Sequence, residues 1–74
     1  SEREKAVSAL VFAGLTNRKI ADTLHVAVRT VEVQRANAMK KMDVENIADF
    51  IAKLAYVEAL KASDFLEALD LEID

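Results

Sequence analysis

Five residues between positions 28 and 42 have side chains suited to recognising another molecule without reacting with it. They are two cations, one carboxylate and two small apolar groups: Arg29, Glu32, Val33, Ala36 and Lys40. At about 100° per residue, a helix over this stretch places all five on one face. In a DNA groove, cations contact phosphates, a carboxylate accepts from a cytosine amine, and small apolar groups allow close approach to thymine methyls. A single surface valine such as Val33 is common, so the prediction rests on the pattern and not on one residue.

Residues for covalent or metal chemistry are scarce in this sequence. His25 is the only histidine, and it has no second ligand or carboxylate neighbour. The absence of cysteine excludes disulfides and thiolate metal sites. No acid, base and nucleophile stand in a recognisable arrangement. We therefore expect no enzyme, no catalytic or metal-binding residue and no cofactor, and we assign His25 to a turn.

Charge is unevenly distributed along the 74 residues, whose net charge is −3. Residues 1–55 hold nine Lys or Arg and seven Asp or Glu, whereas residues 56–74 hold one Lys and six acids. Residues 14–42 carry six basic and two acidic residues, which favours a polyanionic partner for this part of the chain. No apolar run approaches the roughly 20 residues of a membrane span, so we expect a cytoplasmic domain without membrane contact.

Three short helices are expected to position the candidate face. The first begins at Ser1, which forms a capping box with Glu4, and ends at Gly14. Its inward positions include Val7, Leu10 and Val11. The second starts at the N-cap Thr16 and reaches about Leu24. Cations in its first turn oppose the helix dipole, which fits either an anion bound at that end or an ordinary solvated surface.

The third helix runs from about Val28 to Met42 and turns its other side inward. Its inward stripe consists of Val31, Gln34, Ala38 and Met42, with Arg35 and Lys41 on the two edges. The elements over residues 16–42 therefore form a helix-turn-helix.

A fourth helix is expected to begin at Asn46, with Asp49 as its capping partner. Its apolar side is wide and comprises Ile47, Phe50, Ile51, Leu54 and Val57. This side closes a symmetric dimer, or it only covers the first and third helices.

The acidic residues 61–74 form a second amphipathic segment. Ser63 and Asp64 can restart a helix, with Glu67 as the capping partner of Asp64. The apolar residues Phe65, Leu66, Leu69 and Ile73 share one side. In order of preference, this tail packs on its own domain, extends the fourth helix into a dimer contact, or frays. A minority hypothesis is that it competes with DNA for the basic face.

A family resemblance covers Ser1 to about Leu54. It rests on Ser1-Glu2-Arg3-Glu4, Gly14-Leu15-Thr16-Asn17, Ile20-Ala21, Leu24, Arg29-Thr30-Val31-Glu32-Val33, Arg35-Ala36-Asn37 and Lys41-Met42. In these motifs the chain resembles the C-terminal helix-turn-helix domain of LuxR/FixJ-type regulators, and most closely the FixJ-like branch of two-component response regulators. The resemblance implies an all-α, four-helix LuxR-type bundle, here with an additional acidic C-terminal helical segment.

The resemblance also implies a site. It places the third helix in the major groove of double-stranded DNA, with Glu32, Val33 and Ala36 facing the bases. The phosphate contacts that it implies are Thr16, Asn17, Lys19, Arg29, Thr30, Arg35 and Lys40. It implies a homodimer through helix 46–60, with Ile47, Phe50, Ile51 and Leu54 at the contact. RNA polymerase and an upstream receiver domain are further expected partners. No receiver is present in this sequence, so we expect an excised or separately made effector domain.

Four positions and the acidic tail depart from the family pattern. Ala27 replaces the usual Ser at the N-cap of the recognition helix, at a cost of about 1 kcal/mol unless another group serves. Gln34 stands where His is usual, Ile47 where Arg is common, and Ser8 where Leu is usual. The acidic tail exceeds the usual ending.

Our first hypothesis is therefore a sequence-specific DNA-binding domain of a bacterial transcriptional regulator, over residues 1–60, followed by the acidic tail 61–74. The alternative is a helical protein-interaction or dimerisation module without strong DNA binding. Binding to a duplex at two salt concentrations separates the two hypotheses.

Overall fold

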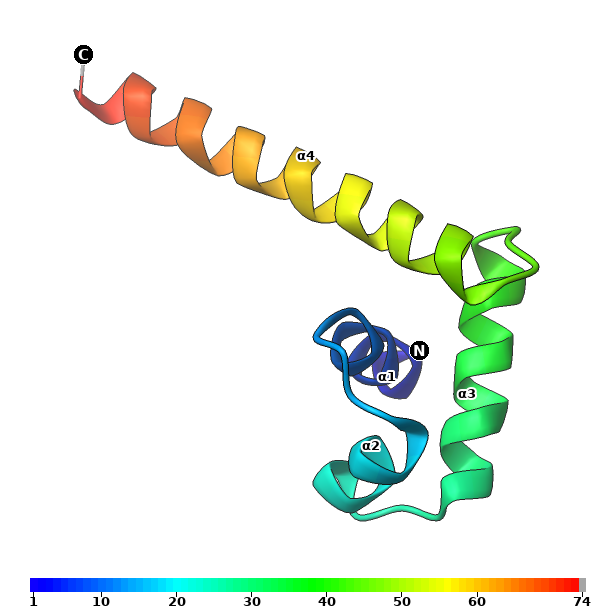
Figure 1. Ribbon diagram of the computed structural model, residues 1–74. Coiled ribbons are helices and arrows are strands. Elements are labelled where there is room, and N and C mark those ends of the chain that lie inside the picture. The colour runs from blue at the N-terminus through cyan, green and yellow to red at the C-terminus, as the bar shows by residue number, and fades with distance from the viewer. Residues whose placement is uncertain (74) are drawn as a thin grey trace.

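The computed structural model describes residues 1–73, and the side chains of residues 1–70. It contains four helices: α1 (Glu2–Phe12), α2 (Asn17–Leu24), α3 (Val28–Lys41) and α4 (Ile47–Ile73). No strand occurs in residues 1–73, and the expected all-α class is confirmed. Helices α1, α2 and α3 pack together, and α4 crosses α1 and then projects away as one long rod (Figure 1).

Both ends of α1 are set by local interactions. The Ser1 hydroxyl accepts from the Glu4 amide at 3.2 Å, and the Glu4 carboxylate accepts from the Ser1 amino group at 3.1 Å, so the predicted capping box is confirmed. At the other end Gly14 has a φ of +93°, and the Leu15 amide donates to the Leu10 carbonyl. This bond closes a Schellman motif, in which glycine takes the left-handed position without steric cost.

The helix-turn-helix follows the expected bounds to within a residue. Thr16 caps α2 by accepting from the Lys19 amide at 3.2 Å. His25 ends α2 in the left-handed region, so its place in the turn is confirmed. Ala27 occupies the N-cap of α3 without a side-chain hydrogen bond, as the sequence indicated. Asp43 follows α3 with a φ of +56°, a conformation that Asp tolerates better than most residues.

One small core holds α1, α2, α3 and the start of α4 together. Its buried side chains are Val7, Val11, Ile20, Ala21, Val31, Ala38 and Phe50. The predicted inward stripe of α3 is confirmed, because Val31 and Ala38 are buried while Gln34 and Met42 are half-buried. Phe50 is the largest fully buried side chain, and it fixes the first turns of α4 on the core.

The start of α4 agrees with the sequence. The Asn46 side chain accepts from the Asp49 amide at 2.9 Å and donates to the Asp49 carboxylate at 3.1 Å. The expected restart at Ser63 and Asp64 is wrong, because α4 passes through both residues without a break. Helical hydrogen bonding continues there, since neither residue disrupts a helix interior as proline does.

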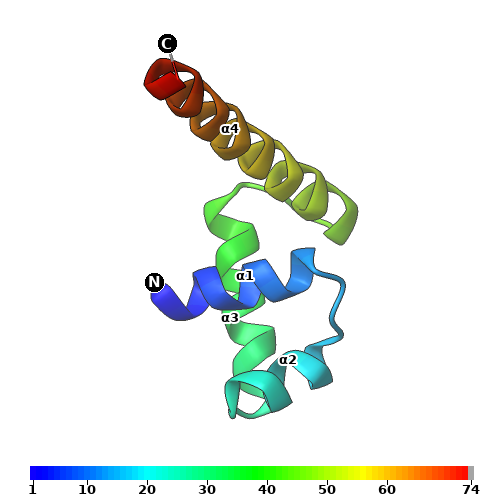
Figure 2. The ribbon, with the colours of Figure 1, turned by 90° about the vertical axis from the view of Figure 1, so that its left-hand side faces the viewer.

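Residues 61–70 of the tail do not pack into the core of their own domain, which corrects the arrangement that we ranked first. Every side chain from Ala55 to Asp70 is exposed, and the second half of α4 stands clear of the other helices in both views (Figures 1 and 2). The tail lengthens α4, which crosses α1 and continues past it (Figures 1 and 2). The expected place of Ile73 on the apolar side lies outside the described side chains. Within the described residues, no helix is long and apolar enough to cross a membrane.

Candidate nucleic-acid interface

The outward face of α3 is as the helical arithmetic predicted. Arg29, Glu32, Val33, Ala36 and Lys40 are all exposed, and Val33 keeps 40% of its surface in water. The opposite side of the same helix is anchored in the core, so the face is held on a rigid element. Since all five side chains are exposed, the acidic tail covers none of them within the described residues.

An ion pair links two of these residues. Arg29 Nη1 lies 3.3 Å from Glu32 Oε2, one turn along the helix, and both side chains are largely exposed. Exposed pairs of this kind contribute about 0–1 kcal/mol, so either partner can exchange the other for an external group at little cost. The ion pair therefore orients both side chains and leaves each of them available to an external partner.

The start of α2 is joined to the middle of α3. Arg35 Nη1 donates to Asn17 Oδ1 over 2.9 Å, between residues 18 positions apart in sequence. Arg35 is half-buried and has further N–H donors, since a guanidinium carries five. The bond groups the expected phosphate residues Asn17 and Arg35, and it places them beside the exposed Lys19 and the N-cap Thr16.

Thr16 also leaves donors available at this helix end. Its hydroxyl accepts from the Lys19 amide and its carbonyl from the Ile20 amide, and its own O–H remains able to donate. Among the described residues, the amides of Asn17 and Arg18 have no acceptor. Free amides, a hydroxyl and cations form an anion-binding end, which supports the anion alternative weighed for this segment.

The remaining expected phosphate residues lie at the two ends of α3. Arg29 and the half-buried Thr30 belong to its first turn, where the absent cap at Ala27 leaves helix amides open. Lys40 lies in the last turn and borders a shallow hollow that also contains Asp43 and Glu45. These carboxylates reduce the positive potential around Lys40 compared with that at the start of α2.

Two interactions join α3 to the neighbouring helices α1 and α4. Neither was predicted from the sequence. Lys41 Nζ lies 2.6 Å from Glu4 Oε1, which joins the end of α3 to α1. Lys53 Nζ donates to the Met42 carbonyl at 2.6 Å, which joins α4 to the end of α3. Lys41 was placed only at the edge of the inward stripe, and no local spacing connects it with Glu4. The Lys41 ammonium, and then the amino terminus, hold the pKa of Glu4 below its ordinary value by donating hydrogen bonds.

Comparison with known proteins gives a consistent result. Residues 1–54 match the family described as bacterial regulatory proteins, luxR family. The chain is 43% identical over 51 residues to the tetrathionate response regulatory protein TtrR of Salmonella typhimurium, covering 69% of this chain and 25% of that protein. It is 47% identical over 51 residues to the transcriptional regulatory protein FixJ of Rhizobium meliloti, with the same coverage of 69% and 25%. The chain thus matches about a quarter of the length of these relatives. No solved structure matched.

Proposed function

This chain belongs to the luxR family of bacterial regulatory proteins, a family of DNA-binding transcription regulators, and we propose that it binds a specific sequence of double-stranded DNA with α3 in the major groove. The proposal is carried by one observation: the exposed face of α3 has small apolar groups at its centre and cations toward its ends. Small central groups allow the helix to sit deep in a groove about 12 Å wide, while the cations meet the phosphates at its edges.

The three base-facing residues have different roles in this proposal. Glu32 accepts a hydrogen bond from a cytosine amine once Arg29 has turned to a phosphate. Val33 and Ala36 contact thymine methyl groups or the apolar edge of a base. None of the three forms a bidentate pair with a base, so several base sequences suit this face.

The phosphate contacts fall into groups along the interface. Thr16, Asn17, Lys19 and Arg35 hold one phosphate at the start of α2, where the 2.9 Å bond between Asn17 and Arg35 supports the grouping. Arg29 and Thr30 hold another at the start of α3, and Lys40 meets the backbone at its far end. These contacts fix the orientation of α3 but carry no sequence information themselves.

Dimerisation through the first half of α4 completes the proposal. Ile47 is 38% exposed and Ile51 is 40% exposed, and Leu54 is half-buried beside them. Phe50, which we expected at this contact, lies in the core of its own domain and has no surface left for a second copy. We therefore propose Ile47, Ile51 and Leu54 as the contact. An upstream receiver domain and RNA polymerase are the further partners in this scheme.

The experiment begins with selection of bound sequences from a random duplex library. The selected duplex is then titrated at two salt concentrations against the parent, Val33→Glu, Ala36→Glu and the control Ala52→Glu. Ala36 and Ala52 are both exposed helical alanines, so their variants carry the same charge and differ only in the helix that carries it.

We expect parent affinity to fall steeply with salt, because phosphate contacts release counterions. The variants at Val33 and Ala36 should lose about tenfold or more in affinity at unchanged helical content, while Ala52→Glu binds as the parent does. Equal losses of DNA affinity in Ala36→Glu and Ala52→Glu would contradict the proposal that α3 contacts the DNA.

A second candidate function is a protein-interaction module. It is favoured by the acidic residues 56–74 and by the exposed side chains of Tyr56, Phe65 and Leu66 on the projecting part of α4. Negligible binding to random duplex at low salt, together with self-association, would select this function over the first.

A further inference from the structure

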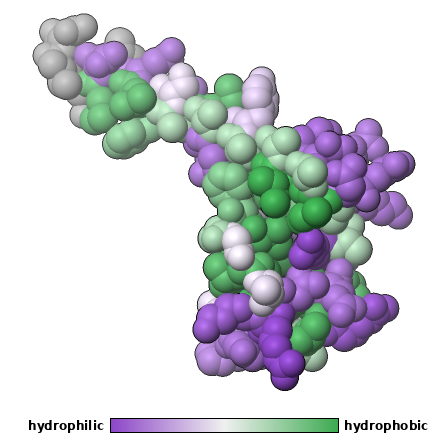
Figure 3. Space-filling model, in the orientation of Figure 1, coloured by the Kyte–Doolittle hydropathy of each residue, from purple (hydrophilic) through white to green (hydrophobic). Residues whose placement is uncertain are grey.

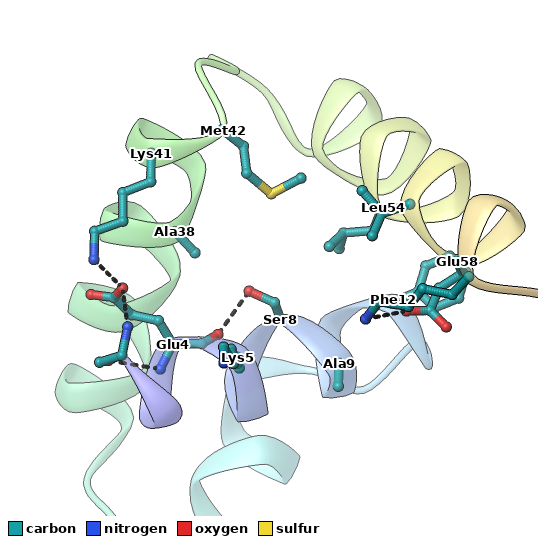
Figure 4. Close-up of a pocket in the computed structure, with 13 residues that line it drawn as sticks. Glu4, Lys5, Ser8, Ala9, Phe12, Ala38, Lys41, Met42, Leu54 and Glu58 are labelled. Atoms are coloured by element: carbon teal, nitrogen blue, oxygen red, sulfur yellow. Dashed lines mark hydrogen bonds and ion pairs between the residues drawn. The ribbon is translucent and has the colours of Figure 1, made fainter. Parts of the chain in front are cut away.

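An apolar groove lies between α1, the end of α3 and α4, on a different side of the domain from the outward face of α3. It encloses about 680 Å³, and Phe12, Met42, Leu54 and Val57 supply apolar walls. Met42 and Leu54 point into the open space above Ser8, whose small side chain leaves the groove unfilled (Figure 4). A volume of this size accommodates several side chains of a docked helix.

The wall that α4 contributes to this groove is repeated further along the same helix. Three turns of 3.6 residues span about 11 residues, so positions eleven apart share a face. Leu54, Val57 and Glu58 line the groove, and eleven residues later stand Phe65, Ala68 and Leu69. The face of α4 that packs beside α1 therefore continues past the end of the domain, with Phe65 63% exposed.

This continued face forms part of an apolar patch on the projecting end of the molecule. Figure 3 shows hydrophobic atoms gathered there, well separated from the domain, beside hydrophilic ones. Asp64, Glu67 and Asp70 are the acids of this segment whose side chains the structure describes. Past Lys61, which lines the groove, the tail is thus an acidic amphipathic helix whose side chains are exposed as far as Asp70.

The rim of the groove carries charges of both signs, including Glu4 and Glu58, and its lysines are the groups that can meet the acids of the tail. Lys5, Lys41 and Lys61 line it, and each is paired with one glutamate of its own domain: Glu2, Glu4 and Glu58. These lysine side chains remain 65–76% exposed. Because an ammonium has three N–H donors, each can also donate to a second carboxylate.

We propose that the groove receives the tail of a second copy of this chain, with the two α4 helices antiparallel. Phe65, Ala68 and Leu69 of each copy enter the groove of the other, and the acids of the tail approach the lysines at its rim. A parallel arrangement would instead place two acidic tails side by side. One two-fold contact covers both the groove and the apolar tail face in each copy. This contact shares Leu54 with the one proposed at Ile47 and Ile51 and continues the same face of α4 toward the tail. It does not depend on DNA binding.

The oligomeric state of paired variants tests the proposal. Phe65 and Leu66 are adjacent and similarly exposed, at 63% and 59%. Both belong to the broad apolar side of the tail, but Leu66 lies about 100° around the helix from Phe65, outside the narrower face that continues the groove wall. Light scattering over a concentration series should show a dimer for the parent chain. We expect Phe65→Asp to weaken the dimer by about tenfold or more, as loss of a central aromatic contact does, and Leu66→Asp to leave it intact. A monomeric parent, or a larger effect of Leu66→Asp, overturns the proposal.

Cysteine pairing tests the occupant directly, because the chain has no cysteine of its own. Ser8→Cys places a thiol of nearly the same size in the groove, and Ala68→Cys places one on the tail face. Mixing the two variants, one of them mass-tagged, should give a mixed disulfide under mild oxidation. Ala59→Cys, on the opposite side of α4, is the control partner for Ser8→Cys. Equal cross-linking with both partners, or none with Ala68→Cys, contradicts the swapped tail. DNA binding measured on the same variants reports separately on the function proposed for α3.

Discussion

The outward face of α3 and the tail of α4 both expose apolar side chains, yet they differ in what lies behind them. Val31 and Ala38 anchor α3 in the core from the opposite side, so the positions of Val33 and Ala36 are fixed by packing. The tail has no such support, because every side chain from Ala55 to Asp70 is exposed. The surrounding charge also differs, since cations border α3 and acids border the tail. An exposed apolar surface therefore indicates a binding site. The packing behind that surface and the charges around it indicate which kind of partner binds there.

The largest expected difference between a supported and an unsupported part of the molecule is between two phenylalanines of α4. Phe50→Ala removes a fully buried ring, and we expect a loss of about 3–5 kcal/mol in the free energy of unfolding. Phe65→Ala removes an exposed ring and should change the free energy of unfolding by less than about 0.5 kcal/mol when measured on the monomer. Urea denaturation followed by circular dichroism, at a protein concentration too low for association, measures both. Comparable losses would mean that the tail packs on its own domain in solution.

Capping gives a smaller effect on the α3 side. Ala27→Ser supplies the side-chain acceptor that the N-cap of α3 lacks, and it should raise the free energy of unfolding by about 1 kcal/mol. If the open amides of this turn bind a phosphate, the new serine competes for one of them. DNA affinity should then stay unchanged or fall, although the variant is more stable. Thermal unfolding and duplex titration of one preparation separate the two effects. Ala62→Ser, in the interior of α4, is the control for adding a hydroxyl where no cap is needed.

The smallest expected effect concerns the decrease in folding stability at low pH. The pKa of Glu4 is lowered in the folded state, so its contribution is fully present above the unfolded-state pKa and is lost as the pH falls through the lower folded-state value. The loss therefore occurs below the ordinary value of 4.5. Glu4→Gln should flatten the dependence of the unfolding midpoint on pH in that range. Glu67→Gln on the tail is the control and should leave the decrease at low pH unchanged, and a parent-like slope for Glu4→Gln would contradict the role of Lys41.

Local patterns predicted the helices well because each boundary is set by neighbouring residues. Ser1 with Glu4, Thr16, Gly14 and Asn46 with Asp49 all act over three or four positions, and the structure confirms each of them. The inward stripe of α3 was equally accessible, since helical geometry fixes it.

The misses concern what lies far away in sequence. Whether Phe50 belongs to the core or to a dimer depends on where α1 passes. The position of the tail depends on how α4 crosses α1, and neither is encoded in the periodicity of α4. The bonds from Lys41 to Glu4 and from Arg35 to Asn17 span 37 and 18 positions, and no spacing rule connects such pairs. The residues proposed to face the bases are argued from a resemblance and from the exposure of their side chains.

The bond from Lys53 to the Met42 carbonyl acts as a brace at a joint. On one side of the joint is the helix proposed to read DNA, and on the other is the helix proposed to join two copies. In the proposed dimer, the angle between α3 and α4 would therefore set how far apart the two reading helices lie. Half-sites one turn apart are separated by about 34 Å, so a change in the angle between α3 and α4 would alter how well both reading helices fit the duplex. The spacing between half-sites would then be encoded at Lys53, which touches no base, and independently of the sequence read within each half-site.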